Sequence, residues 1–243
     1  MNFTFENLRK FLEVVSHYRT WRFCDWNGEP GILLRHDIDL YLQPVEQIAA
    51  LEAEAGVAAT IFVMTTSDFY NVSSKQSRHL LRSLNDNGFE IGLHFDPTVY
   101  GAATTAELSG RAKDEARIIE DAIGTPVSSL SLHNPSIMNG IIQIDGFVNT
   151  YDPRYFIQDT YVSDSRHTFR RDPFDIIRQA ESKVVQVLLH PFQYSENGGS
   201  YRDLFQAYAE HVIHTVDDDF AKNSAYVDEL PEGLAPRLRW DTN

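Results

Sequence analysis

The chain contains short apolar runs that end abruptly in polar and ionisable residues. The clearest is GILLRHDID, residues 31–39, in which three consecutive apolar residues precede an arginine, a histidine and two aspartates. An apolar run without polar alternation is typical of a strand covered on both faces, as in a parallel sheet. Ionisable groups at the end of such a strand are costly to bury unless they are paired, hydrogen-bonded or bound to a metal. The pattern therefore predicts a buried strand that ends in a functional site.

The same arrangement recurs three times along the chain. The runs FEIGLH, SSLSLH and VVQVLLH end at His94, His133 and His190, so that with His36 four of the nine histidines follow a strand-like run. In a barrel of parallel strands the carboxyl ends converge on one mouth, whereas an open sheet would spread these residues along an edge. No glycine-rich dinucleotide fingerprint follows the first strand, which further disfavours an open doubly wound sheet. The pattern predicts an α/β barrel.

The hydrophobic periodicity predicts about seven strands that alternate with helices. The expected strands are residues 32–34, 58–64, 89–93, 128–132, 147–151, 160–162 and 184–189. The expected helices are residues 4–18, 44–56, 75–87, 104–123, 175–183 and 202–216. We expect a loop at 21–30. For residues 137–144 the sequence allows either a short helix or an irregular connection. We expect one domain over residues 1–243, with the helix at 4–18 and a C-terminal tail, about 217–243, packed on the barrel.

Composition narrows the class of protein. Hydrophobic and charged fractions of 42% and 23% over 243 residues are ordinary for a soluble globular chain. Acidic residues outnumber basic ones 35 to 21, giving a net charge of −14, so binding to nucleic acid is not expected. The N-terminal stretch is amphipathic rather than uniformly apolar, and no run approaches a membrane span. With Cys24 alone no internal disulfide forms, and we expect a cytoplasmic protein. The sequence does not indicate its oligomeric state.

The residues at the strand ends are suited to hold a metal. Zinc takes imidazole nitrogen and carboxylate oxygen, and catalytic sites usually combine about three protein ligands with one open position. Asp39, His94 and one further group meet that requirement. We therefore predict a divalent metal as cofactor, with zinc as the expected ion.

The ordered motifs RHDID, EIGLHFDPTVY, SLHNPS, YVSDSRH and LLHPFQY resemble those of the polysaccharide deacetylase family, the NodB-like carbohydrate esterases, in a divergent branch with an H-D-x-D first motif. The resemblance covers about residues 31 to 195. It implies an irregular (β/α)7 barrel and the metal-dependent removal of an acetyl or formyl group from an amino sugar. An N-acylated amino sugar is the partner it implies, and bacterial surface polysaccharide biosynthesis is the pathway.

The resemblance also implies roles for single residues. Asp37 resembles the catalytic base, Asp39 and His94 resemble metal ligands, and His190 resembles the late histidine that acts as general acid. A base can take a proton from water, and an imidazolium can protonate the departing amine. His36 is expected to support a ligand rather than to be one, because it points to the side of the strand opposite to Asp37.

Three positions depart from the family's pattern. Ile38 separates the two acids of the first motif, so the assignment of base and ligand between them stays open. Thr98 stands where the family has a further histidine, which leaves a ligand missing. His133 stands in place of an arginine that orients the base, so we expect it either to complete the metal shell or to hold the base. Asp96 is a second candidate ligand, with loop capping as the alternative.

Residues after the late strands are candidates for the rim of the site. Asp164, Ser165 and Arg166 are expected to bind sugar hydroxyls, and Phe192 and Tyr194 to stack on a sugar face. Two other functions stay open at this point. One is a degenerate domain that binds carbohydrate without turning it over, against which Asp37 and His190 argue. The other is a metal-dependent phosphoesterase, whose usual pair of histidines separated by one residue is absent.

Overall fold

The sheet of this protein follows the predicted apolar runs closely. The computed structural model describes residues 2–135 and 141–233. The strands are β1 (Thr20–Trp21), β2 (Gly31–Ile38), β3 (Thr60–Val63), β4 (Glu90–Phe95), β5 (Ser129–Leu132), β6 (Val148–Asn149), β7 (Tyr161–Ser163) and β8 (Val184–Leu189). Every predicted strand is present. β2 is buried along all eight residues, as the unbroken apolar run requires.

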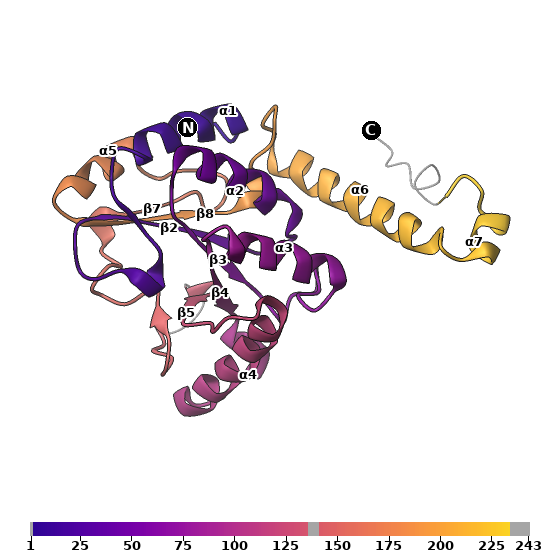
Figure 1. The fold of residues 1–243 in the computed structure, drawn as a ribbon, viewed down its shortest axis with the longest axis horizontal. Coiled ribbons are helices and arrows are strands. Elements are labelled where there is room, and N and C mark those ends of the chain that lie inside the picture. Colours follow the sequence, from indigo (N-terminus) through magenta and orange to yellow (C-terminus); the bar gives the residue numbers. More distant parts are fainter. Residues whose placement is uncertain (1, 136–140, 234–243) are drawn as a thin grey trace. The chain divides into compact units, whose positions relative to one another are not determined.

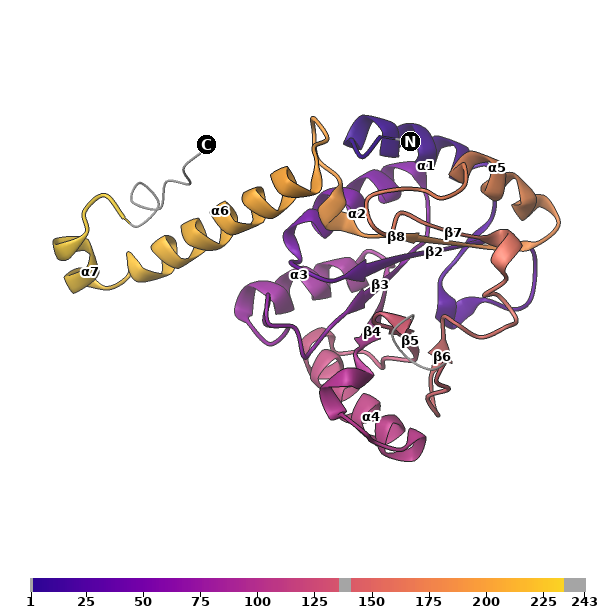
Figure 2. The same cartoon turned by 180° about the vertical axis from the view of Figure 1, so that it is seen from behind.

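All paired strands are parallel, in the order β6-β5-β4-β3-β2-β8-β7, and β1 also pairs with β2. The last strand, β8, thus returns beside β2, as it does in a barrel. Among the described residues no pairing joins β6 to β7, so the curved sheet stays open at that point (Figures 1 and 2). The prediction of an irregular α/β barrel is confirmed.

The helices begin and end at residues suited to those positions. They are α1 (Phe5–Val15), α2 (Gln43–Ala55), α3 (Lys75–Asp86), α4 (Thr105–Ile123) and α5 (Pro173–Ile177). Thr104 and Glu107 form a reciprocal capping box at the start of α4, and Gly124 ends that helix in the left-handed conformation. These helices lie along one side of the curved sheet (Figures 1 and 2).

The sheet has two chemically different faces, because side chains alternate along a strand. The outer face, toward the helices, is apolar; Ile32 and Leu34 of β2 and Val185 and Val187 of β8 belong to its core. The inner face carries Arg35 and Asp37 of β2, together with polar residues of β4, β5 and β8. A smaller apolar cluster also lies on the inner face: Trp21, Phe23, Leu33, Phe62 and Tyr155. The outer face holds the fold together, and the inner face is free for chemistry.

Gly92 of β4 is required by close packing on the inner face. A Cβ at this position would lie 2.5 Å from Cε1 of Phe62, closer than side chains approach. The glycine therefore makes room for the ring of Phe62 beside the site.

Three predicted elements differ from the structure. The loop expected at 21–30 is wrong in part, because Trp21 pairs with Leu33 in β1 and a short 3-10 turn covers Phe23–Asp25. The helix expected at 175–183 begins earlier and ends as a 3-10 turn, Arg178–Glu181. Of the ambiguous segment 137–144, residues 137–140 lie outside the described residues, and 141–144 have no regular secondary structure.

The chain divides into two compact units, residues 1–197 and 198–243. The second unit contains α6 (Tyr201–Phe220), longer than the predicted helix, and α7 (Ser224–Glu229). That the C-terminal tail packs on the barrel, as one domain, stays a prediction. No helix among residues 2–135 and 141–233 is long and apolar enough to cross a membrane.

Candidate metal centre

Three side chains from the carboxyl ends of different strands meet on the inner face. Asp39 follows β2 directly, His94 is the penultimate residue of β4, and His133 follows β5. One ligand atom from each lies within 4.8 Å of the others, so the group could hold a metal ion. His94 Nε2 and His133 Nδ1 lie 3.3 and 3.4 Å from Asp39 Oδ1, and 3.0 Å from each other. The structure thus brings together the three residues that the sequence predicted as ligands.

The contacts of the two imidazoles fit a metal site. The other ring nitrogen of His94, Nδ1, lies 3.2 Å from the carbonyl oxygen of Ser131 and donates to it, which leaves Nε2 a lone pair. Nε2 of His133 lies 2.8 Å from the side-chain amide of Asn134. With that amide turned so that its oxygen accepts from Nε2, Nδ1 of His133 keeps its lone pair. Both rings then direct a free nitrogen toward Asp39, as metal-binding histidines do.

Asp37 lies beside this group and is held by its own partners. Its Oδ2 accepts a hydrogen bond from Ser131 Oγ at 2.9 Å and lies 3.5 Å from Nη2 of Arg35. Arg35 is fully buried and donates to the hydroxyl of Tyr151 at 3.0 Å, with its guanidinium 4.9 Å from that ring. Of the two roles open for His133, the geometry therefore favours the metal group, because other residues hold Asp37. It likewise places Asp39, and not Asp37, in the group that could hold a metal ion.

Arg35 and Ser131 were not assigned a role from the sequence. Alternation along β2 could have indicated Arg35, since residues two apart share a face and Asp37 was already a candidate. No signal in the sequence indicated Ser131, because its contact with Asp37 spans 94 positions.

His190 faces the group from the end of β8. Its Nε2 lies 3.7 Å from Asp39 Oδ2, and its Nδ1 donates to Asp164 Oδ1 at 2.5 Å. The backbone N–H of His190 donates to the second carboxylate oxygen of Asp164 at 2.9 Å. Asp164 therefore determines both the orientation of the ring and which nitrogen carries the proton.

The electrostatics follow from these contacts. Without a bound metal, His94 Nε2 and His133 Nδ1 can carry a hydrogen and donate to Asp39. Burial would raise the pKa of Asp39, but these hydrogen bonds and the nearby His190 then lower it well below its usual range. Burial opposes protonation of His190, yet Asp164 raises the pKa of this imidazole to about 9. The pKa of His133 is raised as well, because Asp39 outweighs the effect of burial.

Two of the predicted rim residues are wrong. Asp164 does not offer its carboxylate to a sugar, because it is fully buried and both its oxygens accept from His190. Tyr194 is only 3% exposed, and its ring packs edge-on against Phe3 at 5.5 Å. In both cases the side chain turns into the protein, where it satisfies a buried group or fills space.

The other rim candidates stay predictions. Ser165 is half-buried, and its backbone N–H donates to Ser163 Oγ. Arg166 is exposed, with a left-handed backbone at φ +62°. Phe192 is half-buried, and its ring lies 6.4 Å from that of His190, so it is placed near the site.

Asp96 and His36 have contacts away from the metal group. Asp96 accepts from the backbone N–H and the hydroxyl of Thr98, at 2.9 and 2.6 Å, and so caps a 3-10 turn. The loop-capping alternative is the one observed. His36 bonds Glu52 of α2 at 2.7 Å on the outer face, so it supports the helix rather than a ligand of the site.

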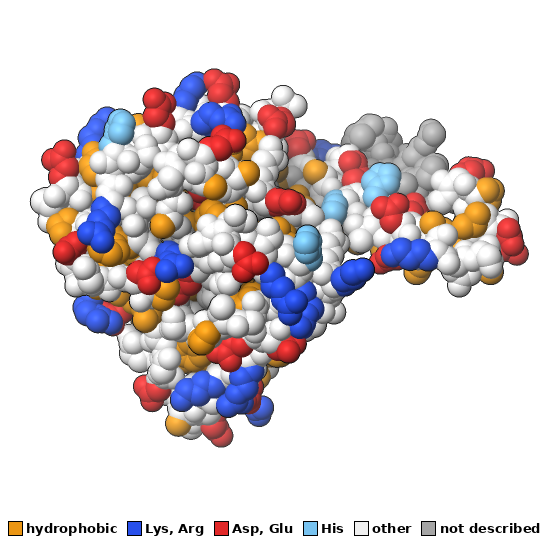
Figure 3. Space-filling view, viewed as in Figure 1, with side chains coloured by type: hydrophobic (Ala, Val, Ile, Leu, Met, Phe, Trp, Pro, Cys, Tyr) orange, Lys and Arg blue, Asp and Glu red, His pale blue; other side chains and the backbone are white. Residues whose placement is uncertain are grey.

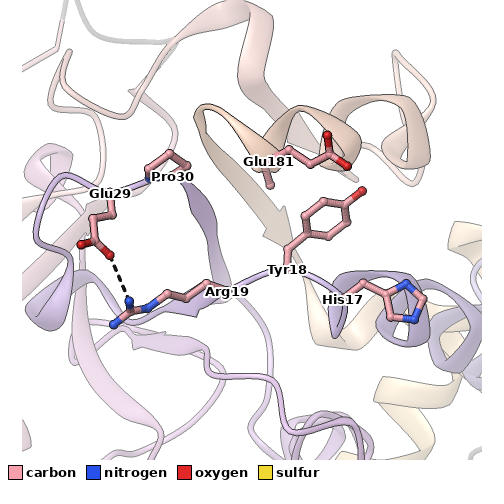
Figure 4. A pocket seen from close by; sticks show the side chains of 7 residues that line it. His17, Tyr18, Arg19, Glu29, Pro30 and Glu181 are labelled. Carbon is pink, nitrogen blue, oxygen red and sulfur yellow. Dashed lines mark hydrogen bonds and ion pairs between the residues drawn. The ribbon is translucent and has the colours of Figure 1, made fainter.

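A hollow of about 610 Å³ lies elsewhere, beside the residues that precede β2 and β8 (Figure 4). Arg19 and Glu29 on its wall pair with each other at 3.0 Å and remain exposed. The polar side chains that line it are exposed or half-buried, so the hollow does not form a built binding site. On the face of the molecule drawn in Figure 3, acidic and basic side chains are intermingled.

No family model and no curated protein matches this chain. Several solved structures are similar to it. The Xyl-CE4 domain of a multidomain xylanase from the hindgut metagenome of Trinervitermes trinervoides is 17% identical, with 79% of this chain and 84% of that chain covered and a TM-score of 0.47. A family 4 carbohydrate esterase from Streptomyces lividans is 16% identical, with coverages of 67% and 79% and a TM-score of 0.44.

A CE4 family pseudoenzyme from Bacillus anthracis is also similar, at 17% identity, 75% coverage of this chain and a TM-score of 0.46. This chain spans 62% of the length of that protein. At such low identity a likeness concerns the fold, and the function has to be argued from the side chains of this chain.

Proposed function

We propose that this protein is a metal-dependent hydrolase that removes an acyl group from the nitrogen of an amino sugar. The observation that carries the proposal is the convergence, on one face of the sheet, of a possible metal group with a carboxylate and an imidazole at its edge. Such a set combines Lewis-acid chemistry with a separate base and acid. This combination suits the hydrolysis of an amide bond, whose carbonyl is unreactive and whose amine is a poor leaving group until it is protonated.

In the proposed reaction, Asp39, His94 and His133 would hold the cation. A bound divalent cation supplies a Lewis acid that polarises a carbonyl and makes water more acidic. Asp37 takes the proton of the attacking water, and Ser131 and Arg35 keep its carboxylate in place. His190, fixed by Asp164, gives a proton to the nitrogen as the carbon–nitrogen bond breaks. The products are the free amino sugar and a carboxylic acid.

Zinc is the ion we propose, because two imidazoles and one carboxylate form a donor set that suits it. An acetyl or formyl group, a role in bacterial surface polysaccharide biosynthesis and a cytoplasmic location complete the proposal. The acyl group and the pathway rest on the motif resemblance, and the location rests on the single cysteine of the chain.

The test begins with the metal content of purified protein. Acetate and formate release is then measured on free, nucleotide-linked and oligomeric N-acyl amino sugars. We expect about one metal per chain, and Asp37→Asn should abolish release while metal content stays unchanged. Asp86→Asn, at an exposed position of α3, is the matched control and should behave as wild type.

Each other outcome has a defined meaning. Stoichiometric metal without hydrolysis of any acylated sugar would contradict the proposal and favour a domain that binds carbohydrate. Phosphate release from sugar phosphates, without release of acid, would favour a phosphoesterase. A protein that binds no metal, with Asp39→Asn indistinguishable from wild type, would reject both enzyme classes.

A further inference from the structure

The first residues of the chain contact both loops that hold the His190–Asp164 pair. Ser195, five residues after His190, accepts a hydrogen bond from the backbone N–H of Phe5 at 3.1 Å. Its own N–H donates to the carbonyl of Phe3 at 3.3 Å, so Thr4 lies beside it as in a parallel sheet. The N-terminal segment is thereby attached to the loop that follows His190.

The ring of Phe3 contacts side chains from both loops. It meets Tyr194, from the loop after His190, edge-on at 5.5 Å. It also lies 4.0 Å from the ring of His167 and stacks on Phe169 at 5.6 Å, and both follow Asp164. Phe3 is only 8% exposed. One aromatic side chain therefore bridges the two segments on which the acid–base pair stands.

The turn after Asp164 needs support, because its backbone is strained. Arg166 and His167 have φ angles of +62° and +56°, two consecutive residues in a region that glycine adopts readily and other residues avoid. Such conformations persist only where the surroundings enforce them. Phe3 supports this conformation through its tilted ring contact with His167, with 4.0 Å between the ring centroids. His167 lies inside the turn that the backbone hydrogen bond from Thr168 N–H to the carbonyl oxygen of Asp164 closes at 3.3 Å.

We propose that Phe3 is a positioning residue for His190. By joining the turn after Asp164 to the loop after His190, it keeps the carboxylate of Asp164 on Nδ1 of the imidazole. The catalytic consequence rests on the hydrolase proposed above, but the effect on the hydrogen bond does not. Since small misplacements of a reacting group cost up to about 100-fold in rate, loss of the ring should lower kcat about 10-fold or more.

The test uses Phe3→Ala and Phe3→Leu, with Phe3→Tyr as the variant that retains the ring. The first measurement is the proton spectrum of histidine N–H groups. A proton shared between an imidazole and a buried carboxylate resonates far downfield, and both His190 and His36 have such a partner. His190→Gln and His36→Gln assign the two signals. We expect the alanine variant to lose or broaden the His190 signal and to retain the His36 signal, with the tyrosine variant like wild type.

The second measurement is steady-state kinetics on a substrate that the wild type hydrolyses. We expect a lower kcat for the alanine variant, a smaller decrease for the leucine variant, and KM and metal content unchanged in both. Leu84→Ala in α3, which removes a buried side chain remote from both loops, controls for a general loss of stability.

Two outcomes would overturn the inference. The first is an unchanged His190 signal in the alanine variant, and the second is an equal loss of the His36 signal, which would indicate general loosening. If no acylated sugar is hydrolysed by the wild type, the proposed function fails, yet the spectra still decide whether Phe3 holds the pair.

Discussion

Two buried histidine–carboxylate pairs lie on opposite faces of the same sheet. On the outer face His36 bonds Glu52 at 2.7 Å, and on the inner face His190 bonds Asp164 at 2.5 Å. The difference lies in the second ring nitrogen. Among the described residues, Nδ1 of His36 has no hydrogen-bond partner, whereas Nε2 of His190 lies 3.7 Å from Asp39. The same kind of pair therefore connects a helix to the sheet in one place and directs a ring nitrogen toward the candidate metal group in the other.

The outer pair belongs to a region whose other side chains are apolar. His36 lies between Leu34 and Ile38 on β2, and α2 covers it with Glu52. Both partners are fully buried, so neither reaches a substrate. The two histidines differ in the face of the sheet to which their strands direct them. Substitutions in the two pairs should therefore have different effects on kcat and on stability.

The largest effect is expected from His190→Gln. Loss of the group proposed as general acid should lower kcat by about 10² to 10⁴, because acid–base catalysis contributes about that much. Metal content should change little, and kcat is measured on the fraction that remains folded, because the buried carboxylate of Asp164 also loses its imidazole partner. The comparison is His36→Gln, assayed on the fraction that remains folded, which should keep its kcat. Equal losses of kcat in both variants would show that the two faces are not functionally separate.

The outer pair should instead govern stability. His36→Leu leaves the carboxylate of Glu52 buried without its partner and should cost about 3 kcal/mol in the free energy of unfolding, measured by urea titration. Replacement of both partners by leucine should restore most of it, since well-packed apolar residues substitute for buried pairs at little cost. A double variant no more stable than the single one would mean that the packing around His36, and not the pair, is responsible.

Metal should stabilise the inner face specifically. At a free zinc concentration about 100 times the dissociation constant, binding should add about 2.7 kcal/mol to the free energy of unfolding, seen as a higher thermal midpoint than after chelation. His133→Ala should abolish this increase. Asp96→Asn, which removes a carboxylate charge near the site but keeps the capping oxygen, should retain it. A zinc-dependent increase that survives in His133→Ala would remove this residue from the metal group.

The smallest effect is expected from Tyr151→Phe. The hydroxyl that accepts from Arg35 disappears while the ring under the guanidinium stays, at a cost of about 1 kcal/mol in the support of Asp37 and thus about fivefold in kcat. The matched control is Tyr155→Phe, whose hydroxyl donates to the backbone of Asn149 at 2.5 Å within the small apolar cluster. That variant should lose stability and keep kcat. A reversed outcome would assign Arg35 a structural role alone.

The elements that could be predicted are those written in local patterns. The run 31–39 predicted β2 and the site at its end. The capping residues Thr104 and Gly124 lie at the two ends of α4, where the periodicity predicted that the helix begins and ends. β1 was missed because two residues are too short for any periodicity. Its pairing with β2 depends on a strand ten residues further along the chain.

The sequence by itself determined that Asp39, His94 and His133 would meet, because parallel strands bring their carboxyl ends to one edge of a sheet. Only the tertiary structure decided which partners these groups and their neighbours have. It assigned Asp164 to His190 rather than to the rim, and it gave Asp37 to Ser131 and Arg35 rather than to His133. The pattern of a strand predicts which face of the sheet a side chain occupies and how near it lies to the end of the strand. Its contacts depend on segments as far away as Tyr151, 116 positions from Arg35, whose approach only the packed chain determines.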